Sequence, residues 1–332
     1  MVRERGNRPP TIHDVASEAG VSKSLVSLAV RGDPGVRSET RARILDAADR
    51  LGYRSNPWAR SLVRGRSQMI GVLVDDLRSG YHTDVVHGVE DAADANGLAV
   101  VIGDARRERN ILRARLESMV SLGIDGAVIV SGRGDTEALS AFAGRLALVV
   151  VGRPVGIARA VGQVSNDDRS GARLAVHHLA AFGHRRIAHV RGSTRPASRA
   201  REESYQATMR ELGLEEHVRI RDPEELLREL VAGAPDAPTA VFCSNDRIAI
   251  DLIGRAIDAG LNVPSDLSVA GYDNIEISSW LRPSLTSVDQ PRRAMGELAL
   301  RQLLEIIEGG PSRHDVVAPS LVVRESTMPT AE

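Results

Sequence analysis

Two polar residues follow closely after apolar runs in the C-terminal half of the chain. Asp273 comes two positions after the run 267–271, and Asn245 comes two positions after the run 240–243. If both runs are parallel strands, both side chains project from strand ends into a cleft. A carboxylate accepts hydrogen bonds from two adjacent ligand hydroxyls, and an amide both donates and accepts. The alternative is that both residues cap helices, as Asp and Asn commonly do.

Arginine and aromatic side chains complete the candidates for a ligand-binding cleft. Arg199 and Arg201 offer planar guanidinium forks, although the acidic residues at 202 and 203 are alternative partners for either one. Tyr81 and Trp280 offer ring faces for a sugar or a base, and plain packing is the alternative for Trp280. This mixture of groups favours a polyol, with a purine as the alternative. The predicted ligand-binding residues are Tyr81, Arg199, Arg201, Asn245, Asp273 and Trp280.

Short apolar runs alternate with helical stretches from Gln68 onward. The runs predicted as buried strands are 69–74, 98–102, 126–130, 146–151, 186–190, 240–243 and 267–271. The helices predicted between the first of them are 84–96, 108–122 and 136–143. This alternation predicts parallel sheets covered by helices. The pattern occurs twice, so we expect two α/β lobes with a ligand cleft at the carboxyl ends of their strands.

The sequence offers little for metal binding or catalysis. His177 and His178 are adjacent on a predicted helix and point apart, so we predict no metal site. Cys243 is the only cysteine, so we expect no internal disulfide and interpret this residue as part of the core. No dinucleotide-binding, P-loop or nucleophile-elbow motif occurs. We expect no cofactor and no catalysis, although an enzyme is the main alternative because parallel α/β lobes host many.

Charge is unevenly distributed along the 332 residues, a length that predicts two or three compact units. The formal net charge is −1, yet residues 1–66 hold 13 Lys and Arg against 7 Asp and Glu. A basic head on an acidic body indicates that the head binds a polyanion. No stretch is apolar enough to span a bilayer, and residues 1–10 lack the apolar segment of a secretory signal. We therefore expect a cytoplasmic protein without a membrane partner.

Three short helices are predicted in the basic head. The first follows the capping residue Thr11 and ends at Gly20, the second spans 23–30 after the capping residue Ser22, and the third spans about 38–51. Two helices joined by a turn of about three residues, on a three-helix core, have helix-turn-helix geometry. A three-helix bundle without DNA binding is the alternative. The predicted inward residues are Ile12, Val15, Ala16, Ala19, Val26, Ala29, Val30, Ile44, Leu45, Ala48 and Leu51.

At these residues the chain closely resembles the LacI/GalR family of transcription factors. In the head and hinge the resemblance rests on Asp14-Val15-Ala16, Ala19-Gly20-Val21-Ser22, Val26-Ser27, Thr40-Arg41, Leu51-Gly52-Tyr53, Asn56-Pro57 and Ala59-Arg60-Ser61-Leu62. In the body it rests on Asp76-Leu77 with Gly80-Tyr81, Gly171-Ala172 through Gly183-His184, 240–246, 264–273 and 283–288. The resemblance covers nearly the whole chain. It implies a helix-turn-helix head with a hinge, followed by a periplasmic-binding-protein-like body.

The resemblance also implies how the head contacts DNA. Lys23, Ser24 and Leu28 would face base edges in the major groove. Phosphate contacts would come from Thr11, Ser22, Ser27, Thr40, Tyr53 and Asn56. The family wedges the leucine at the Leu62 position into a minor-groove step, and Arg31 and Ala59 complete the predicted DNA-binding set. Leu25 replaces a common threonine, and Leu28 stands where arginine or histidine often reads a base, which leaves the base preference open.

The function implied is that of a repressor whose affinity for a pseudo-palindromic DNA operator is controlled by a small effector, a sugar or sugar derivative. We expect a homodimer, because no heptad extension follows Met328. The expected domains are the head, 1–55; the hinge and linker, 56–67; and the body, 68–332. Within the body we expect one lobe of 68–165 plus 290–316 and another of 166–289 plus 317–330. A periplasmic sugar-binding protein is an alternative that would explain the two lobes but not the DNA-binding head.

Overall fold

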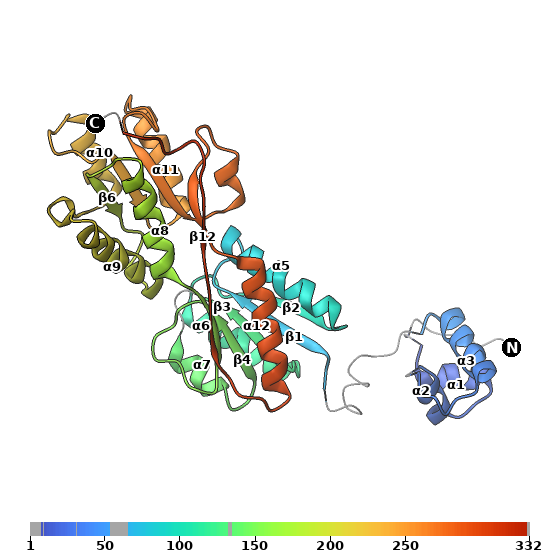
Figure 1. The fold of residues 1–332 in the computed structure, drawn as a ribbon. Helices are drawn as coiled ribbons and strands as arrows, with labels where there is room; N and C mark the ends of the chain where they lie inside the picture. The colour runs from blue at the N-terminus through green and yellow to red at the C-terminus, as the bar shows by residue number, and fades with distance from the viewer. Residues whose placement is uncertain (1–7, 9, 31, 54–65, 132–134, 331–332) are drawn as a thin grey trace. The chain divides into compact units, whose positions relative to one another are not determined.

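The computed structural model describes residues 8, 10–30, 32–53, 66–131 and 135–330. The chain forms two compact units that divide between Ser67 and Gln68 (Figure 1). Four residues of the predicted DNA-binding set lie outside the described residues: Arg31, Asn56, Ala59 and Leu62.

The head is a small three-helix unit. Its helices are α1 (Ile12–Ala19), α2 (Lys23–Val30) and α3 (Ser38–Leu51). The backbone N–H and the hydroxyl of Thr11 both donate to the Asp14 carboxylate, at 2.8 and 2.7 Å, and these bonds fix the start of α1. Gly20 ends α1 in the left-handed conformation, with φ of 62°. The predicted helices are therefore present.

The core of the head differs from the predicted one at a single large residue. Val15, Val26 and Ile44 are fully buried, as their spacing predicts. Leu45, which we placed inward, is 42% exposed, and Ala47 is fully buried in its place. Ala47 lies three positions after Ile44 and therefore on the same face of α3, whereas Leu45 is rotated by about 100° from it.

The body contains two six-stranded sheets, each made of strands from distant parts of the chain. The first has the order β11-β5-β4-β3-β1-β2 and the second β12-β10-β9-β8-β6-β7. The strands of the first sheet are β1 (Met69–Val74), β2 (Ala99–Asp104), β3 (Gly126–Val130), β4 (Ala147–Val151), β5 (Gly162–Asn166) and β11 (His314–Val317). Those of the second are β6 (Ile187–Val190), β7 (Arg219–Arg221), β8 (Ala240–Cys243), β9 (Ser268–Asp273), β10 (Thr286–Asp289) and β12 (Ser320–Val322).

Helices cover both faces of each sheet. The first sheet packs against α5 (Gly80–Ala95) and α12 (Arg292–Ile307) on one face, and against α6 (Arg109–Ser121) and α7 (Thr136–Phe142) on the other. The second sheet packs against α8 (Asp168–Ala181) and α9 (Pro196–Glu211) on one face, and against α10 (Pro223–Val231) and α11 (Asp246–Asp258) on the other. Two short 3-10 helices, Glu215–His217 and Glu276–Ser279, also belong to the unit built on the second sheet. We call these layered units the first lobe and the second lobe.

In the part of the chain that the structure describes, the backbone passes between the lobes three times: from β5 to α8, from β10 to α12, and from β11 to β12 (Figure 1). The sheets are parallel, as predicted, except that the edge strand β12 pairs antiparallel with β10. Within the ranges that the structure describes, no helix is both long and apolar enough to cross a bilayer.

Candidate functional site

A cavity of about 840 Å³ lies between the lobes, within the size range of small-ligand sites. Residues at the carboxyl ends of strands from both sheets line it. The first lobe contributes residues after β1, β3, β4 and β5, and the second contributes residues after β6, β8, β9 and β10. Because parallel strands end at the same edge of a sheet, side chains from distant parts of the sequence meet there.

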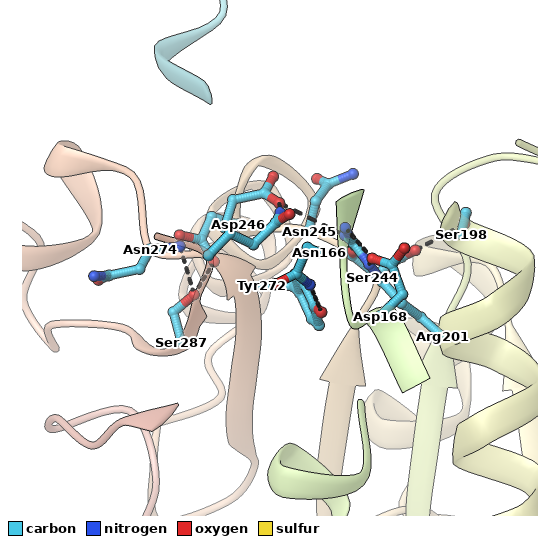
Figure 2. Close-up of polar contacts among 12 residues, drawn as sticks. Asn166, Asp168, Ser198, Arg201, Ser244, Asn245, Asp246, Tyr272, Asn274 and Ser287 are labelled. Carbon is cyan, nitrogen blue, oxygen red and sulfur yellow. Dashed lines mark hydrogen bonds and ion pairs between the residues drawn. The ribbon is translucent and has the colours of Figure 1, made fainter. Parts of the chain in front are cut away.

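Arg201 is the centre of a buried ionic network on the second-lobe wall (Figure 2). Its Nε donates to Asp168 Oδ1 at 2.9 Å, and its Nη1 donates to the Ser244 carbonyl at 2.7 Å. The guanidinium lies 3.6 Å from the centre of the Tyr272 ring. The side chains of Arg201 and Asp168 are only 9% and 4% exposed. The network therefore holds a fixed cation at the cavity surface.

Asp273 faces this cation from the end of β9. Its Oδ1 lies 3.6 Å from Arg201 Nη1 and accepts a 2.6 Å hydrogen bond from Gln290. Burial raises the pKa of Asp273 to about 7, against the opposing effect of the Arg201 charge. The residue has a φ of 108°, which residues other than glycine rarely adopt and which is typical of functional sites. Asp273 lines the cavity and caps no helix.

Asn245 caps a helix and also lies on the cavity lining. Its side chain accepts a 3.0 Å hydrogen bond from the Ile248 backbone N–H and so caps α11. It also lines the cavity, where its amide nitrogen can donate to a ligand. Tyr81, near the start of α5, lines the opposite, first-lobe wall.

The other two predicted ligand-binding residues lie away from the cavity. Arg199 is exposed on α9 and is not among the lining residues, because it lies on a different face of the helix from Arg201. Trp280 is 64% exposed and is also absent from the lining. The predicted aromatic wall is therefore reduced to Tyr81.

An acidic residue of the first lobe that sequence reasoning missed holds two arginines at the cavity wall. Asp76 Oδ1 accepts from Arg78 Nε at 3.1 Å, and its Oδ2 lies 2.9 Å from Arg107 Nη2. Hydrogen bonds from Arg78 lower the pKa of Asp76 to about 2. The sequence did contain a signal, because Asp76 follows the predicted strand 69–74.

Asp246 fixes the loop that follows β9. Its carboxylate accepts hydrogen bonds from the Ile275 N–H at 2.9 Å and from the hydroxyls of Ser278 and Ser287 at 2.6 and 2.5 Å. Burial raises the pKa of Asp246, while these bonds favour its charged form. The loop is therefore tied to α11 next to Asp273.

The adjacent histidines, His177 and His178, contact polar side chains, and Cys243 is part of the core. His177 Nε2 accepts a 3.2 Å hydrogen bond from Arg173, whereas His178 Nε2 lies 2.9 Å from the Thr327 hydroxyl. Cys243 is fully buried at the end of β8, and burial raises its thiol pKa above the usual range. Among the described residues, no cluster of three or more acidic, histidine or cysteine side chains could hold a metal.

The helix-turn-helix places its predicted base-reading residues on α2. Lys23 and Ser24 are exposed at the start of α2, and Leu28 is half-buried one turn further on. Ser22 Oγ accepts from the Leu25 N–H at 3.2 Å, which leaves the Ser22 hydroxyl proton available to a phosphate. Ser27, Thr40 and Tyr53 are half-buried on the same unit, as is Thr11.

Comparisons with known proteins match both units. Residues 11–56 match the model of bacterial regulatory proteins, lacI family, and residues 176–327 match the periplasmic binding protein-like domain. Catabolite control protein A of Priestia megaterium is 32% identical over 311 residues, 88% of this chain and 91% of that protein. The solved lac repressor dimer bound to operator and the anti-inducer ONPF is 26% identical, with a TM-score of 0.82 over 97% of this chain and 100% of that one. The complex of the transcriptional regulator CelR with cellobiose is 28% identical, with a TM-score of 0.69 over 96% and 99%.

A helix-turn-helix head followed by a two-lobed body with a central cavity defines a DNA-binding transcriptional regulator with a ligand-binding domain. The chain belongs to the LacI family of bacterial regulatory proteins.

Proposed function

We propose that the chain is a transcriptional repressor whose affinity for its operator is set by a sugar or sugar derivative in the interlobe cavity. The observation that carries this proposal is the pairing of Asp273 with Arg201 at the cavity wall, which presents a hydrogen-bond acceptor beside a fixed donor. Adjacent hydroxyls of a polyol match such a pair. The similarity to a regulator solved with cellobiose supports the same ligand class.

The proposed effector contacts come from both lobes. Tyr81 belongs to the first lobe, and Arg201, Asn245 and Asp273 belong to the second. A ligand that contacts both walls favours one arrangement of the lobes over another. It changes operator affinity by its differential affinity for the two arrangements.

The head, in this proposal, acts as part of a homodimer on a pseudo-palindromic operator in the cytoplasm. Lys23, Ser24 and Leu28 read base edges, and Leu62 of the hinge enters the minor groove. Phosphates are held by Thr11, Ser22, Ser27, Thr40, Tyr53 and Asn56, and Arg31 and Ala59 complete the proposed DNA-binding set. The similarity to a repressor dimer solved on its operator supports this role, and no catalysis is proposed.

Operator binding should depend steeply on salt, because residues 1–66 carry 13 basic side chains against 7 acidic ones. If a dimer neutralises about six to ten phosphates, log K falls against log salt with a slope of about −5 to −9. Fluorescence anisotropy with an operator selected from random duplexes measures this slope. A slope near zero would remove the basic head from the mechanism.

Replacement of Asp273 by asparagine should weaken binding of a neutral sugar by about tenfold to a hundredfold. Ligand hydroxyls favour the ionised carboxylate, whose pKa is about 7 in the free protein. In the unsubstituted protein, the affinity for the sugar should therefore rise as the pH increases from 6 to 8, and a proton should be released on binding. The Asp273→Asn variant should show neither effect.

Isothermal titration in buffers of different ionisation enthalpy measures both effects. The probe is the neutral sugar that stabilises the protein most in a thermal-shift screen. Asp258→Asn, at the exposed end of α11, is the control and should behave like the original protein. Equal sugar affinity in Asp273→Asn and the control would remove Asp273 from the effector site.

A further inference from the structure

Arginine dominates the charged lining of the interlobe cavity. Over the described residues, six arginines and four aspartates line it, with neither lysine nor glutamate. The arginines are Arg78, Arg107, Arg153, Arg195, Arg201 and Arg247, and the aspartates are Asp75, Asp76, Asp168 and Asp273. With every aspartate ionised, the lining still carries two more positive than negative charges.

Each of two aspartates is shared by two guanidinium groups. Asp76 lies 3.1 Å from Arg78 and 2.9 Å from Arg107, so one carboxylate serves two guanidinium groups in this cluster on the first lobe, where Asp104 also acts electrostatically on Arg78. Asp168 lies 3.2 Å from Arg153 and 2.9 Å from Arg201, and Asp273 balances the remaining charge there. Two aspartates therefore serve four of the six lining arginines.

Arg247 adds a positive charge on the second-lobe side. It is the second residue of α11, it is exposed, and it lines the cavity. No acidic side chain of the described ranges forms an ion pair with it, whereas Arg255, two turns along α11, pairs with Glu224 and Asp251. An exposed arginine at a helix N-terminus has no help from the helix dipole, which favours anions there. A bound anion would be stabilised both by the charge of Arg247 and by the dipole of α11.

The lining has little surface for ring stacking. Tyr81 is the only Phe, Tyr or Trp side chain among the described lining residues. Polar and charged groups must therefore supply most of the recognition. This arrangement suits a ligand with hydroxyls and a concentrated negative charge better than it suits a flat base.

We propose that the effector is a phosphorylated sugar, with hydroxyls at Asp273 and Arg201 and a phosphate held by the arginines in excess, Arg247 among them. A phosphate monoester carries a charge of about −1.5 to −2 at pH 7, which matches the excess of the lining better than the single charge of a carboxylate. Guanidinium forks bind phosphate oxygens in a bidentate manner. This inference rests on the proposed function, because it specifies the sugar class of the same cavity.

Titration calorimetry of the full-length chain tests the inference. The probes are pentoses and hexoses, their monophosphates, the corresponding sugar acids, and inorganic phosphate alone. We expect the best sugar phosphate to bind at least about tenfold more tightly than its neutral parent, and the sugar acid to fall between them. Arg247→Gln should reduce this affinity ratio by about tenfold, and Arg255→Gln should leave it unchanged.

The outcomes separate this inference from the proposed function. A neutral sugar that binds as tightly as its phosphate, and still changes operator affinity, overturns the inference and leaves the proposed function intact. Failure of every sugar, charged or neutral, to bind overturns the proposed function itself. Inorganic phosphate binding as tightly as the sugar phosphate, or an unchanged ratio in Arg247→Gln, overturns the assigned site.

Discussion

Replacement of Arg201 by methionine is expected to lower the free energy of unfolding of the body by about 3–5 kcal/mol and to abolish effector binding. The side chain is 9% exposed and contacts Asp168, Asp273 and the Ser244 carbonyl. Removal of the guanidinium leaves the buried carboxylates of Asp168 and Asp273 with less opposite charge beside them, and it removes the hydrogen-bond donor proposed for the ligand. Calorimetry of the full chain reports the stability, and titration with the screened ligand reports the binding.

Arg199→Met is the matched control for this prediction. Arg199 lies on the same helix, two residues earlier, but it is exposed and away from the cavity. Surface substitutions of this kind change stability by about 0.5 kcal/mol or less. If the two variants had equal stability and equal ligand affinity, the buried network would not organise the site.

Replacement of Ile44 by alanine should unfold the head and abolish operator binding, while ligand binding by the body persists. Ile44 is fully buried in a small three-helix core. Truncation of such a side chain costs about 2–5 kcal/mol, and domains of this size are stable by only about 3–5 kcal/mol. Anisotropy with the selected operator and calorimetry with the ligand measure the two functions separately.

The neighbouring residue gives the control. Leu45→Ala removes a side chain that is 42% exposed on the same helix, so the head should stay folded. If the Ile44→Ala and Leu45→Ala variants bound the operator with equal affinity, an intact three-helix core would not be required to position α2 on DNA.

The fold was largely predictable because its elements have strong local patterns. The predicted helix 23–30 and the predicted strands 126–130 and 240–243 have the observed bounds. The strand β5 was missed because its sequence, Gly-Gln-Val-Ser-Asn, has a single branched apolar residue, although every residue in it is buried. Pairing with the preceding strand β4 and with β11, which is distant in sequence, places this polar segment in the sheet.

The cavity was predictable only in part. Asp273 and Asn245 were identified because each follows a run that reads as a strand, and the structure places both on the cavity lining. Asp168 follows the missed strand β5, so no local signal pointed to it. The distinction between Arg199 and Arg201 depends on which face of α9 packs against the sheet, and this is a tertiary property.

The central claim is that occupancy of the interlobe cavity controls operator binding. The most direct measurement is the operator affinity of the full-length chain, with and without a saturating concentration of the sugar or sugar phosphate selected by thermal shift. The account predicts a change of about 5-fold to 150-fold, and a change of ligand affinity by the same factor when the operator is bound. An operator affinity that stays the same within error at saturating ligand would contradict it.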